Sequence, residues 1–393
     1  MPENCLRHVD WLKRVSDGVI RKAVPEIMGY EDMRDLEFGW FLPTRGDTLD
    51  YAIPQQVPPS LEMFERVVKT AEDNGFEYIL LPVAAACWDA WLTSALLIRQ
   101  TKSIRMLVAA RPSYINPVLL AKMIATYDQM SEGRISINLI AGQNEVENLA
   151  EGVGLDKDAR YEVMEEEVEI CKALWATREK IDYDGKHYQL KQAHIGPEVF
   201  QKPHPRFYLG GGSGQAAELS AKHSDVHLFW GDTVERIERN IAEMRVLAGK
   251  YGRAEEIGFG MRLQIVCRQD EAEAWDVAES LVRNVTDEQK EVIRTHFANS
   301  VANQRVRQLA DEYGEMIAPH MWTGLTKARP GAGIVIVGTP EQCAETLQGY
   351  IDVGCHSFCM SGYLHDEEAE RFGKWVRPLL CDRNPGRLKP LAA

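Results

Sequence analysis

The 393-residue sequence contains no apolar run of the ~18 residues that a membrane helix needs, so we expect no membrane span. It also lacks an excess of basic residues, since 45 lysines and arginines stand against 59 aspartates and glutamates, a net charge of -14. Because nucleic acids and anionic membranes are bound through clustered cations, this balance argues against both as partners. The N-terminus is charged rather than signal-like, which favours a cytoplasmic location.

Motifs for metal and nucleophilic chemistry are missing too. The eight cysteines are scattered, and the close pair Cys355 and Cys359 falls in a predicted strand without a second pair nearby, whereas structural zinc sites need such a partner pair. No His-Glu-x-x-His, Walker loop or ordered Ser-His-Asp set occurs. We therefore predict reduced thiols, no metal, and an organic cofactor that carries the difficult chemical step.

What the sequence does contain is a regular alternation of short apolar segments with helical patterns, which indicates parallel βαβ units. Eight strands are predicted, at residues 37–42, 78–82, 103–109, 135–140, 206–210, 226–230, 257–267 and 357–361. Helices are predicted at 61–74, 88–99, 118–130, 162–175, 216–223 and 234–251. Eight strands with intervening helices in about 330 residues favour an α/β fold of the (β/α)8 TIM-barrel type over an open sheet.

Three segments fall outside the regular alternation. Residues 1–35 are predicted to be an N-terminal helical extension, and residues 36–393 to be the barrel. An insertion at about 271–333 begins charged and helical and ends in a glycine-rich loop from 322 to 333, which we expect to be a mobile lid. Residues 182–203 are predicted to form a small hairpin that turns at Gly185.

A glycine-rich stretch at 210–214 follows a predicted strand and opens a helix. Backbone N–H groups and a helix N-terminus arranged in this way can hold a phosphate. The stretch from Gly212 to Ala217 also fits a relaxed dinucleotide-binding pattern, with Asp232 about 20 residues on as the ribose-binding acid. A mononucleotide phosphate explains the glycines equally well, and a tight structural turn is a third reading.

Arginines at predicted strand ends are candidate anion ligands. A sulfonate or phosphonate ester stays charged at physiological pH, so its oxygens need fixed donors such as guanidinium groups. Arg262, inside an apolar predicted strand, is the strongest candidate, with a buried structural ion pair as the alternative. Arg329 is either a cation carried by the lid or a surface charge, and Arg45 and Arg111 are weaker candidates.

Tyr363 and His365 are predicted to lie on one side of an extended segment because they are two residues apart. Together they can donate to a developing oxyanion or transfer a proton, or they form a packing pair. Cys87 has no activating histidine nearby in the sequence. We therefore interpret it as a polarizable contact to a cofactor, with an ordinary core thiol as the alternative.

Several phrases occur in one order along residues 38–380, and together they resemble the bacterial luciferase-like flavin monooxygenases. The similarity is closest to the two-component alkanesulfonate monooxygenases. The phrases begin at Trp40 (Trp-Phe-Leu-Pro-Thr), Cys87 (Cys-Trp-Asp-Ala-Trp), Arg111 (Arg-Pro), Asp128 (the block to Gly142), Arg160 (Arg-Tyr-Glu), Tyr208 (Tyr-Leu-Gly-Gly-Gly-Ser), Trp230 (Trp-Gly), Phe259 (Phe-Gly-Met-Arg-Leu), Arg329 (Arg-Pro-Gly-Ala-Gly) and Ser361 (Ser-Gly-Tyr-Leu-His).

The resemblance implies a barrel that binds reduced FMN (FMNH2), supplied by a separate NAD(P)H:FMN reductase, and uses dioxygen as co-substrate. The implied reaction cleaves the C–S bond of an organosulfonate and releases sulfite and an aldehyde. A homodimer or homotetramer is also implied, and the apolar helices after the second and third strands could supply its interface.

The resemblance also assigns roles by position. Gly212, Ser213 and Tyr161 would contact the FMN phosphate, Asn138 the isoalloxazine ring, and Cys87 the reduced flavin. The sulfonate would be surrounded by four residues, and Arg329 would belong to the closing lid. These four are Trp230, Arg262, Tyr363 and His365.

The sequence departs from this family at Gln264, where relatives usually have histidine, and an amide cannot exchange a proton at neutral pH. The acid expected in the loop after the first strand is either Asp47 or Asp50. An added hydrogen-bonding group such as Gln264 would suit a polar sulfonate such as sulfoquinovose, while simple alkanesulfonates stay open. Two alternatives remain: a luciferase-like deazaflavin- or FMN-dependent oxidoreductase on a non-sulfonate substrate, and a non-catalytic flavin-binding relative.

Overall fold

The computed structural model describes residues 34–142, 145–296, 300–329 and 331–388. The predicted N-terminal extension therefore lies outside the described residues, except for Arg34 and Asp35. No helix in the described part of the chain is long and apolar enough to cross a membrane.

Eight parallel strands close into a barrel. They are β1 (Glu37–Phe41), β2 (Tyr78–Leu81), β3 (Arg105–Ala110), β4 (Ile135–Leu139), β7 (Phe207–Gly210), β8 (Val226–Trp230), β9 (Gly258–Cys267) and β13 (Ser357–Ser361). Each strand pairs in parallel with the next, and β13 pairs with β1 to complete the ring. The predicted (β/α)8 barrel is confirmed, and every predicted strand ends within two residues of an observed one.

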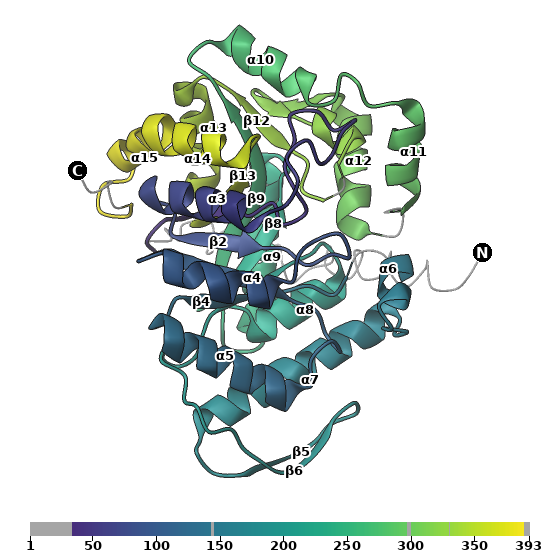
Figure 1. Ribbon diagram of the computed structural model, residues 1–393, viewed down its shortest axis with the longest axis vertical. Coiled ribbons are helices and arrows are strands. Elements are labelled where there is room, and N and C mark those ends of the chain that lie inside the picture. The colour runs from purple at the N-terminus through teal and green to yellow at the C-terminus, as the bar shows by residue number, and fades with distance from the viewer. Residues whose placement is uncertain (1–33, 143–144, 297–299, 330, 389–393) are drawn as a thin grey trace.

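Helices cover the outside of this barrel, as Figure 1 shows. They are α3 (Leu61–Asp73), α4 (Ala90–Leu97) continued by η1 (Ile98–Gln100), α5 (Pro117–Ser131), α6 (Glu145–Ala150), α7 (Lys157–Ala176), α8 (Gly214–His223), α9 (Val234–Gly249), α13 (Pro340–Asp352), α14 (His365–Arg371), η3 (Phe372–Val376) and α15 (Arg377–Arg383). Side-chain caps such as Ser60, Asn116 and Ser213 satisfy the first backbone N–H groups of their helices. Because the helices that follow barrel strands begin at the carboxyl ends of those strands, their N-termini face that end of the barrel.

Between β9 and β13 the chain forms α10 (Glu271–Ser280), α11 (Asp287–His296), α12 (Val301–Tyr313), β10 (Met316–Ala318), β11 (Met321–Trp322), η2 (Gly324–Lys327) and β12 (Val335–Gly338). Helix α10 lies at the top of Figure 1, and α11 and α12 lie at its upper right. Residues 321–322 form β11 and residues 324–327 form η2, so the irregular loop is shorter than the predicted 322–333. Strand β12, which the sequence analysis missed, pairs with β9 from Gln264 to Cys267. Strand β9 thus belongs to the barrel and to the small sheet β10–β11–β12.

The predicted hairpin is present as β5 (Ile181–Asp184) and β6 (Gln189–Ala193), which pair antiparallel. It projects at the lower end of Figure 1, below α7.

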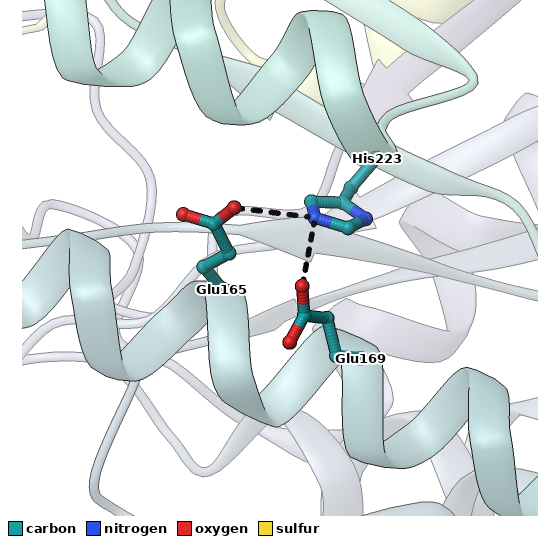
Figure 2. A group of neighbouring side chains, drawn as sticks. All are labelled: Glu165, Glu169 and His223. Carbon is teal, nitrogen blue, oxygen red and sulfur yellow. Dashed lines mark ion pairs between the residues drawn. The ribbon is translucent and has the colours of Figure 1, made fainter. Parts of the chain in front are cut away.

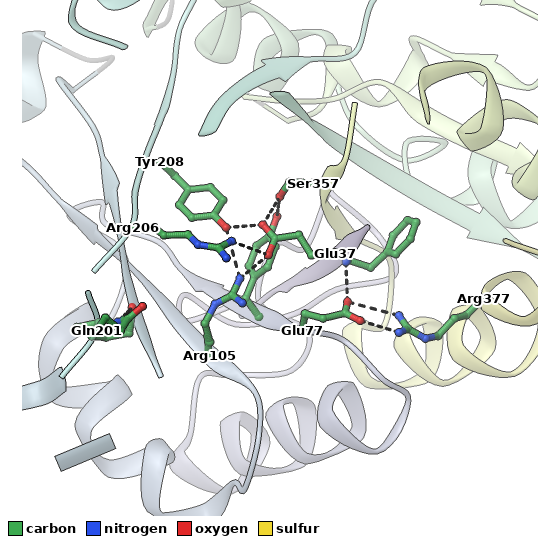
Figure 3. Close-up of polar contacts among 11 residues, drawn as sticks. Glu37, Glu77, Arg105, Gln201, Arg206, Tyr208, Ser357 and Arg377 are labelled. Atoms are coloured by element: carbon green, nitrogen blue, oxygen red, sulfur yellow. Dashed lines mark hydrogen bonds and ion pairs between the residues drawn. The ribbon is translucent and has the colours of Figure 1, made fainter. Parts of the chain in front are cut away.

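A buried polar network fills the barrel at the amino-terminal ends of the strands (Figure 3). The Glu37 carboxylate accepts hydrogen bonds from Arg105 Nη2 (2.6 Å), Ser357 Oγ (2.9 Å) and the Tyr208 hydroxyl. Burial alone would raise the pKa of Glu37, but the charge of Arg105 and its other partners lower it to about 2. The network occupies this end of the barrel interior, so the opposite, carboxyl end is where a ligand can enter.

Candidate functional site

Two arginines from distant parts of the chain meet at the carboxyl end of the barrel. Arg262 on β9 lies in register with Trp230 at the end of β8, so these two predicted residues are neighbours. The Arg262 guanidinium is 4.9 Å from the centroid of the Phe41 ring, and the Arg329 guanidinium is 5.9 Å from the same centroid. One aromatic ring at the end of β1 therefore supports both cations.

Arg262 donates its hydrogen bonds to neutral oxygens. Nη1 donates to the carbonyls of Leu263 (2.8 Å) and Cys359 (3.2 Å), and Nη2 donates to Ser361 Oγ (3.0 Å). Burial and the nearby charge of Arg329 lower the pKa of Arg262. Among the described residues no carboxylate hydrogen-bonds or ion-pairs with Arg262, so the alternative of a buried ion pair is not what the structure has.

Gln264 differs from the expectation that it would contact substrate. Its side chain is 0% exposed. Its Nε2 donates to the Ala332 carbonyl (2.7 Å), and its Oε1 accepts from the hydroxyls of Tyr363 (3.0 Å) and Ser361. The amide nitrogen and the amide oxygen of Gln264 thus both bind other groups of the chain. Gln264 contacts Ser361 and Tyr363 rather than the space in which a substrate would bind.

Tyr363 and His365 do lie together, with ring centroids 5.2 Å apart and rings at 86°. The reason is not the extended segment that the sequence predicted, because His365 is the first residue of α14. Asp47 accepts hydrogen bonds from the His365 backbone N–H (2.8 Å) and from ring Nδ1 (2.9 Å). Although burial raises the pKa of Asp47, interaction with His365 lowers it overall. Of the two acids that the sequence left open, Asp47 contacts His365, whereas Asp50 accepts a hydrogen bond from Asn284 (2.7 Å).

The sequence analysis missed Tyr51, which joins the arginines to this cluster. Its ring meets the Tyr363 ring edge-on at 5.5 Å, and its hydroxyl is in hydrogen-bond contact with Tyr363 and Arg329. Burial, followed by the effect of Tyr363, raises the pKa of Tyr51 well above its ordinary value, so the phenol stays neutral. No local pattern marks Tyr51, but Phe41 had a signal: strand alternation puts it on the face of Glu37, inside the barrel.

The glycine-rich turn after β7 is shaped to admit a ligand at the N-terminus of α8. Ser213 caps that helix through the Ala216 N–H (3.3 Å), and the Tyr161 hydroxyl hydrogen-bonds Ser213. At Gly211, where φ is +153°, a Cβ would lie 2.9 Å from the Ala216 Cβ and 3.5 Å from the Tyr161 hydroxyl. Gly212 is exposed in the turn. This cradle of N–H groups and hydroxyls fits the phosphate of a mononucleotide cofactor.

The Asp232 carboxylate is not available to bind a ribose, as the dinucleotide interpretation requires. Arg305 of α12 binds both of its carboxylate oxygens, at 2.7 and 2.9 Å. This buried acid therefore connects the end of β8 to the segment between β9 and β13 and has no free oxygen face for a ribose.

Asn138 and Cys87 complete the set of predicted cofactor contacts. Asn138, on β4, is in register with Tyr208 of β7, so both side chains point into the barrel. Cys87 follows β2, half-buried, with the Thr44 hydroxyl beside its thiol. Burial raises the pKa of Cys87, so the thiol stays protonated. A protonated thiol suits a polarizable contact, whereas a nucleophile would need the thiolate.

The two weaker arginine candidates lie apart from the pair over Phe41. Arg111 is held by two carboxylates of the α6 region, Glu147 (2.5 Å) and Glu151 (2.6 Å). Arg45 is exposed in the loop after β1. Arg111 is therefore already neutralised within the chain.

Within the described ranges, Glu165, Glu169 and His223 bring potential metal ligands to within 4.8 Å of one another (Figure 2). Lys222 binds the Glu165 carboxylate at 2.8 Å, and the Tyr183 hydroxyl donates to Glu169 at 2.7 Å. His223 ends α8 and so lies away from the carboxyl end of the barrel. The cluster is a charge-compensated ion-pair group on the outside of the barrel.

Comparisons with known proteins agree with this fold. The profile of the family described as luciferase-like monooxygenase matches residues 36–357. Among solved structures, riboflavin lyase (RcaE), solved with modified FMN and riboflavin, superposes with a TM-score of 0.75 at 17% identity, covering 92% of this chain and 94% of that one. EDTA monooxygenase (EmoA) from Chelativorans sp. BNC1 gives 0.73 at 19%, covering 91% and 95%. Coenzyme F420-dependent tetrahydromethanopterin reductase from Methanopyrus kandleri gives 0.64 at 17%, covering 88% and 99%.

Proposed function

The chain belongs to the luciferase-like monooxygenase family, and on that premise we propose that it is a two-component monooxygenase acting on an organosulfonate. Reduced FMN and dioxygen serve to cleave the C–S bond, and the products are sulfite and an aldehyde. The observation that supports this substrate is the pair Arg262 and Arg329 above the Phe41 ring.

The charge balance of this pair favours an anionic substrate. Two guanidinium groups close together repel each other, and Arg262 has only neutral hydrogen-bond partners among the described residues. A sulfonate is anionic at all physiological pH values and presents three acceptor oxygens, so it supplies the negative charge that the hydrogen-bond partners of Arg262 lack. A simple alkanesulfonate and a polar sulfonate such as sulfoquinovose both satisfy this requirement.

The proposed cofactor contacts follow from the cradle at α8. Ser213, Tyr161 and the backbone around Gly212 would hold the FMN phosphate, while Asn138 and Cys87 would contact the flavin ring. Bound reduced FMN would supply the electrons that activate dioxygen. The chain would orient the sulfonate beside it through Arg262, Arg329 and Trp230 and keep water out with the buried Tyr363 and His365.

His365 is the proposed proton-transfer group. Because the Asp47 carboxylate can only accept, the proton on the imidazole is fixed at Nδ1, and Nε2 is the atom that can take a proton from a reacting group. The Tyr363 hydroxyl donates to Gln264, so its proton is directed away from the substrate.

Two protein partners belong to the proposal. Reduced FMN would come from a separate NAD(P)H:FMN reductase, as expected for a two-component enzyme of this family. Self-association is supported by α4, whose Leu92 and Leu96 are 72% and 59% exposed, and by the exposed Leu119 on α5. These two helices follow β2 and β3, and we propose them as the face of a homodimer or homotetramer.

Sulfite release tests the reaction. The purified chain would be incubated with FMN, NADH, dioxygen, a generic flavin reductase and a panel from methanesulfonate to octanesulfonate plus sulfoquinovose. Sulfite from any member supports C–S cleavage, and Arg262→Met should abolish it while leaving reduced-FMN binding intact. Arg66→Met is the matched control, since Arg66 is an exposed arginine paired with Asp366 on the outer helices. Reduced-FMN binding without sulfite from any sulfonate would contradict the proposed substrate.

A luciferase-like deazaflavin- or FMN-dependent oxidoreductase on a non-sulfonate substrate is the second candidate. The superposition with an F420-dependent reductase supports it, since that chain is covered almost completely. Anaerobic titration with reduced FMN and with a reduced deazaflavin separates the candidates, because the first predicts a clear preference for FMN.

A further inference from the structure

Gln264 is the point at which two hydrogen-bond chains end, one from each arginine. In the first, Arg262 Nη2 donates to Ser361 Oγ (3.0 Å), and the Ser361 hydroxyl donates to Gln264 Oε1. In the second, Arg329 contacts the Tyr51 hydroxyl, Tyr51 contacts Tyr363, and the Tyr363 hydroxyl donates to the same Oε1 (3.0 Å). One amide oxygen therefore links both cations over Phe41.

The orientation of this amide is fixed by a group that cannot change its role. The Ala332 carbonyl can only accept, so the Gln264 atom 2.7 Å from it must be the NH2 nitrogen. Oε1 must then face Ser361 and Tyr363, and both hydroxyls must donate to it. Arg329 Nη1 also donates to the Ala332 carbonyl (3.2 Å), so the same carbonyl is tied to one of the two arginines.

A glutamine meets these requirements and a histidine does not. The site needs one donor toward Ala332 and two acceptor lone pairs toward Ser361 and Tyr363. An amide provides an NH2 group and an oxygen with two lone pairs, whereas a neutral imidazole provides one donor and one acceptor. With histidine here, one of the two buried hydroxyls would lose its acceptor.

We propose that Gln264 is a positioning residue for the anion site, which acts through Ser361 and Tyr363 to hold Arg262 and Arg329 over Phe41. Its two ends have separate tasks. Oε1 orients the Ser361 hydroxyl, which contacts Arg262, and the Tyr363 hydroxyl, which reaches Arg329 through Tyr51. Nε2 holds the 331–334 segment against β9 through Ala332. This inference rests on the proposed function only for the chemical identity of the anion.

Variants of Gln264 test the two ends separately. Gln264→Met removes both. Gln264→His keeps a donor for Ala332 but offers one acceptor, and Gln264→Glu offers acceptors but donates to Ala332 only when protonated. The matched control is Gln189→Met on the β5–β6 hairpin, where the side chain also donates to a backbone carbonyl, that of Gly185, at 2.7 Å.

The first readout needs no substrate. Amide hydrogen exchange of residues 331–336 would be measured in the intact chain and expressed relative to wild type at each pH. We expect Gln264→Met to exchange about tenfold faster, since one lost buried hydrogen bond corresponds to about that factor. Gln264→Glu should match wild type at low pH and approach Gln264→Met as pH rises, whereas Gln264→His and Gln189→Met should stay protected.

The second readout is kcat/KM for the best sulfonate of the panel. Gln264→His should lose about tenfold despite its protected segment, because one hydroxyl loses its acceptor. Wild-type exchange in Gln264→Met, or pH-independent exchange in Gln264→Glu, would overturn the proposal. If the exchange results hold but no sulfonate is turned over, the positioning role stands and the proposed substrate is what fails.

Discussion

Asp47 holds His365 at two points, accepting one hydrogen bond from its backbone N–H (2.8 Å) and one from its ring Nδ1 (2.9 Å). Both residues are buried, and the loop after β1 is thereby joined to the start of α14. The first bond satisfies a free N–H at the helix start, and the second fixes the imidazole tautomer. A single carboxylate thus sets both the position and the protonation pattern of His365.

Asp47→Asn should therefore impair the proposed reaction more than it impairs folding. We expect a loss in kcat/KM of roughly 100-fold, the lower end of the range that positioned acid–base groups contribute. The free energy of unfolding at pH 7 should fall by about 1–3 kcal/mol, as for one buried hydrogen-bond partner. Sulfite release and urea unfolding check the two effects. Asp50→Asn in the same loop is the control, and equal effects from both variants would argue against a special role for Asp47.

The same pair gives a pH dependence with a defined sign. The folded pKa of Asp47 is lowered, so its contribution is present above the unfolded pKa and is lost as pH falls through the folded value. The stability difference between wild type and Asp47→Asn should consequently shrink in acid.

Glu37→Gln should lower stability at neutral pH and remove an acid-sensitive contribution. The carboxyl titrates at about 2 rather than 4.5, which corresponds to about 3 kcal/mol. This contribution is full above pH 4.5 and disappears as pH falls toward 2, because protonation breaks the pairing with Arg105. Urea unfolding at pH 7 and pH 3 measures it. The exposed Glu291→Gln is the control, and an unchanged stability at both pH values in Glu37→Gln would refute the role of the network.

The effect of Glu167→Gln on the pH dependence of stability should have the opposite sign to that of Glu37→Gln. Burial raises the pKa of Glu167 to about 7, despite hydrogen bonds from the Ser113 N–H and the Tyr188 hydroxyl, both at 2.8 Å. The contribution of Glu167 to stability is therefore largest below pH 4.5, and about 3 kcal/mol of it is lost as pH rises from 4.5 through 7, because the buried carboxyl must ionise. Thermal melting from pH 4 to pH 9 should show the variant gaining on wild type as pH rises from about 4.5 to 7 and keeping that gain above neutrality, and parallel curves would contradict this.

Gly211→Ala tests the phosphate cradle. The new methyl group would approach the Ala216 Cβ to 2.9 Å at a φ of +153°, so the turn before α8 must shift. We expect the Kd for reduced FMN to rise by about tenfold, equivalent to about 1.4 kcal/mol. Gly214→Ala is the control, because a Cβ there meets nothing within 4 Å. Anaerobic fluorescence titration measures both, and equal affinities in the two variants would place the phosphate elsewhere.

The barrel was predictable because its strands carry their own signal. Segments such as 226–230 and 357–361 are short, mainly apolar runs that are each followed by a glycine, and their order along the chain implies parallel pairing. Strand β12 had the same signal in Ile334-Val335-Ile336-Val337 but was missed, because the eight strands of a barrel had already been assigned. Its partner is the second half of β9, which a count of barrel strands does not anticipate.

Side-chain partners were harder to predict than strands. The sequence placed Arg262, Tyr363 and His365 at one end of the barrel but gave no sign that Asp47 would bind His365 or that Tyr51 would contact Arg329. Such pairs depend on loop conformation and on which rotamer reaches across the barrel. The hydrogen-bond partners of Gln264 were not predicted for the same reason, since only the position of the Ala332 carbonyl shows which way its amide points.

The network around Glu37 has a consequence for the order in which ligands bind and leave the enzyme. Glu37, Arg105 and Tyr208 fill the barrel interior at the amino-terminal ends of the strands, so ligands can enter at the carboxyl end. The α8 cradle and the two arginines over Phe41 both lie at this carboxyl end. A ligand bound in the outer part of this end delays the release of a ligand bound deeper in the barrel. The order in which the ligands bind therefore constrains the order in which they are released.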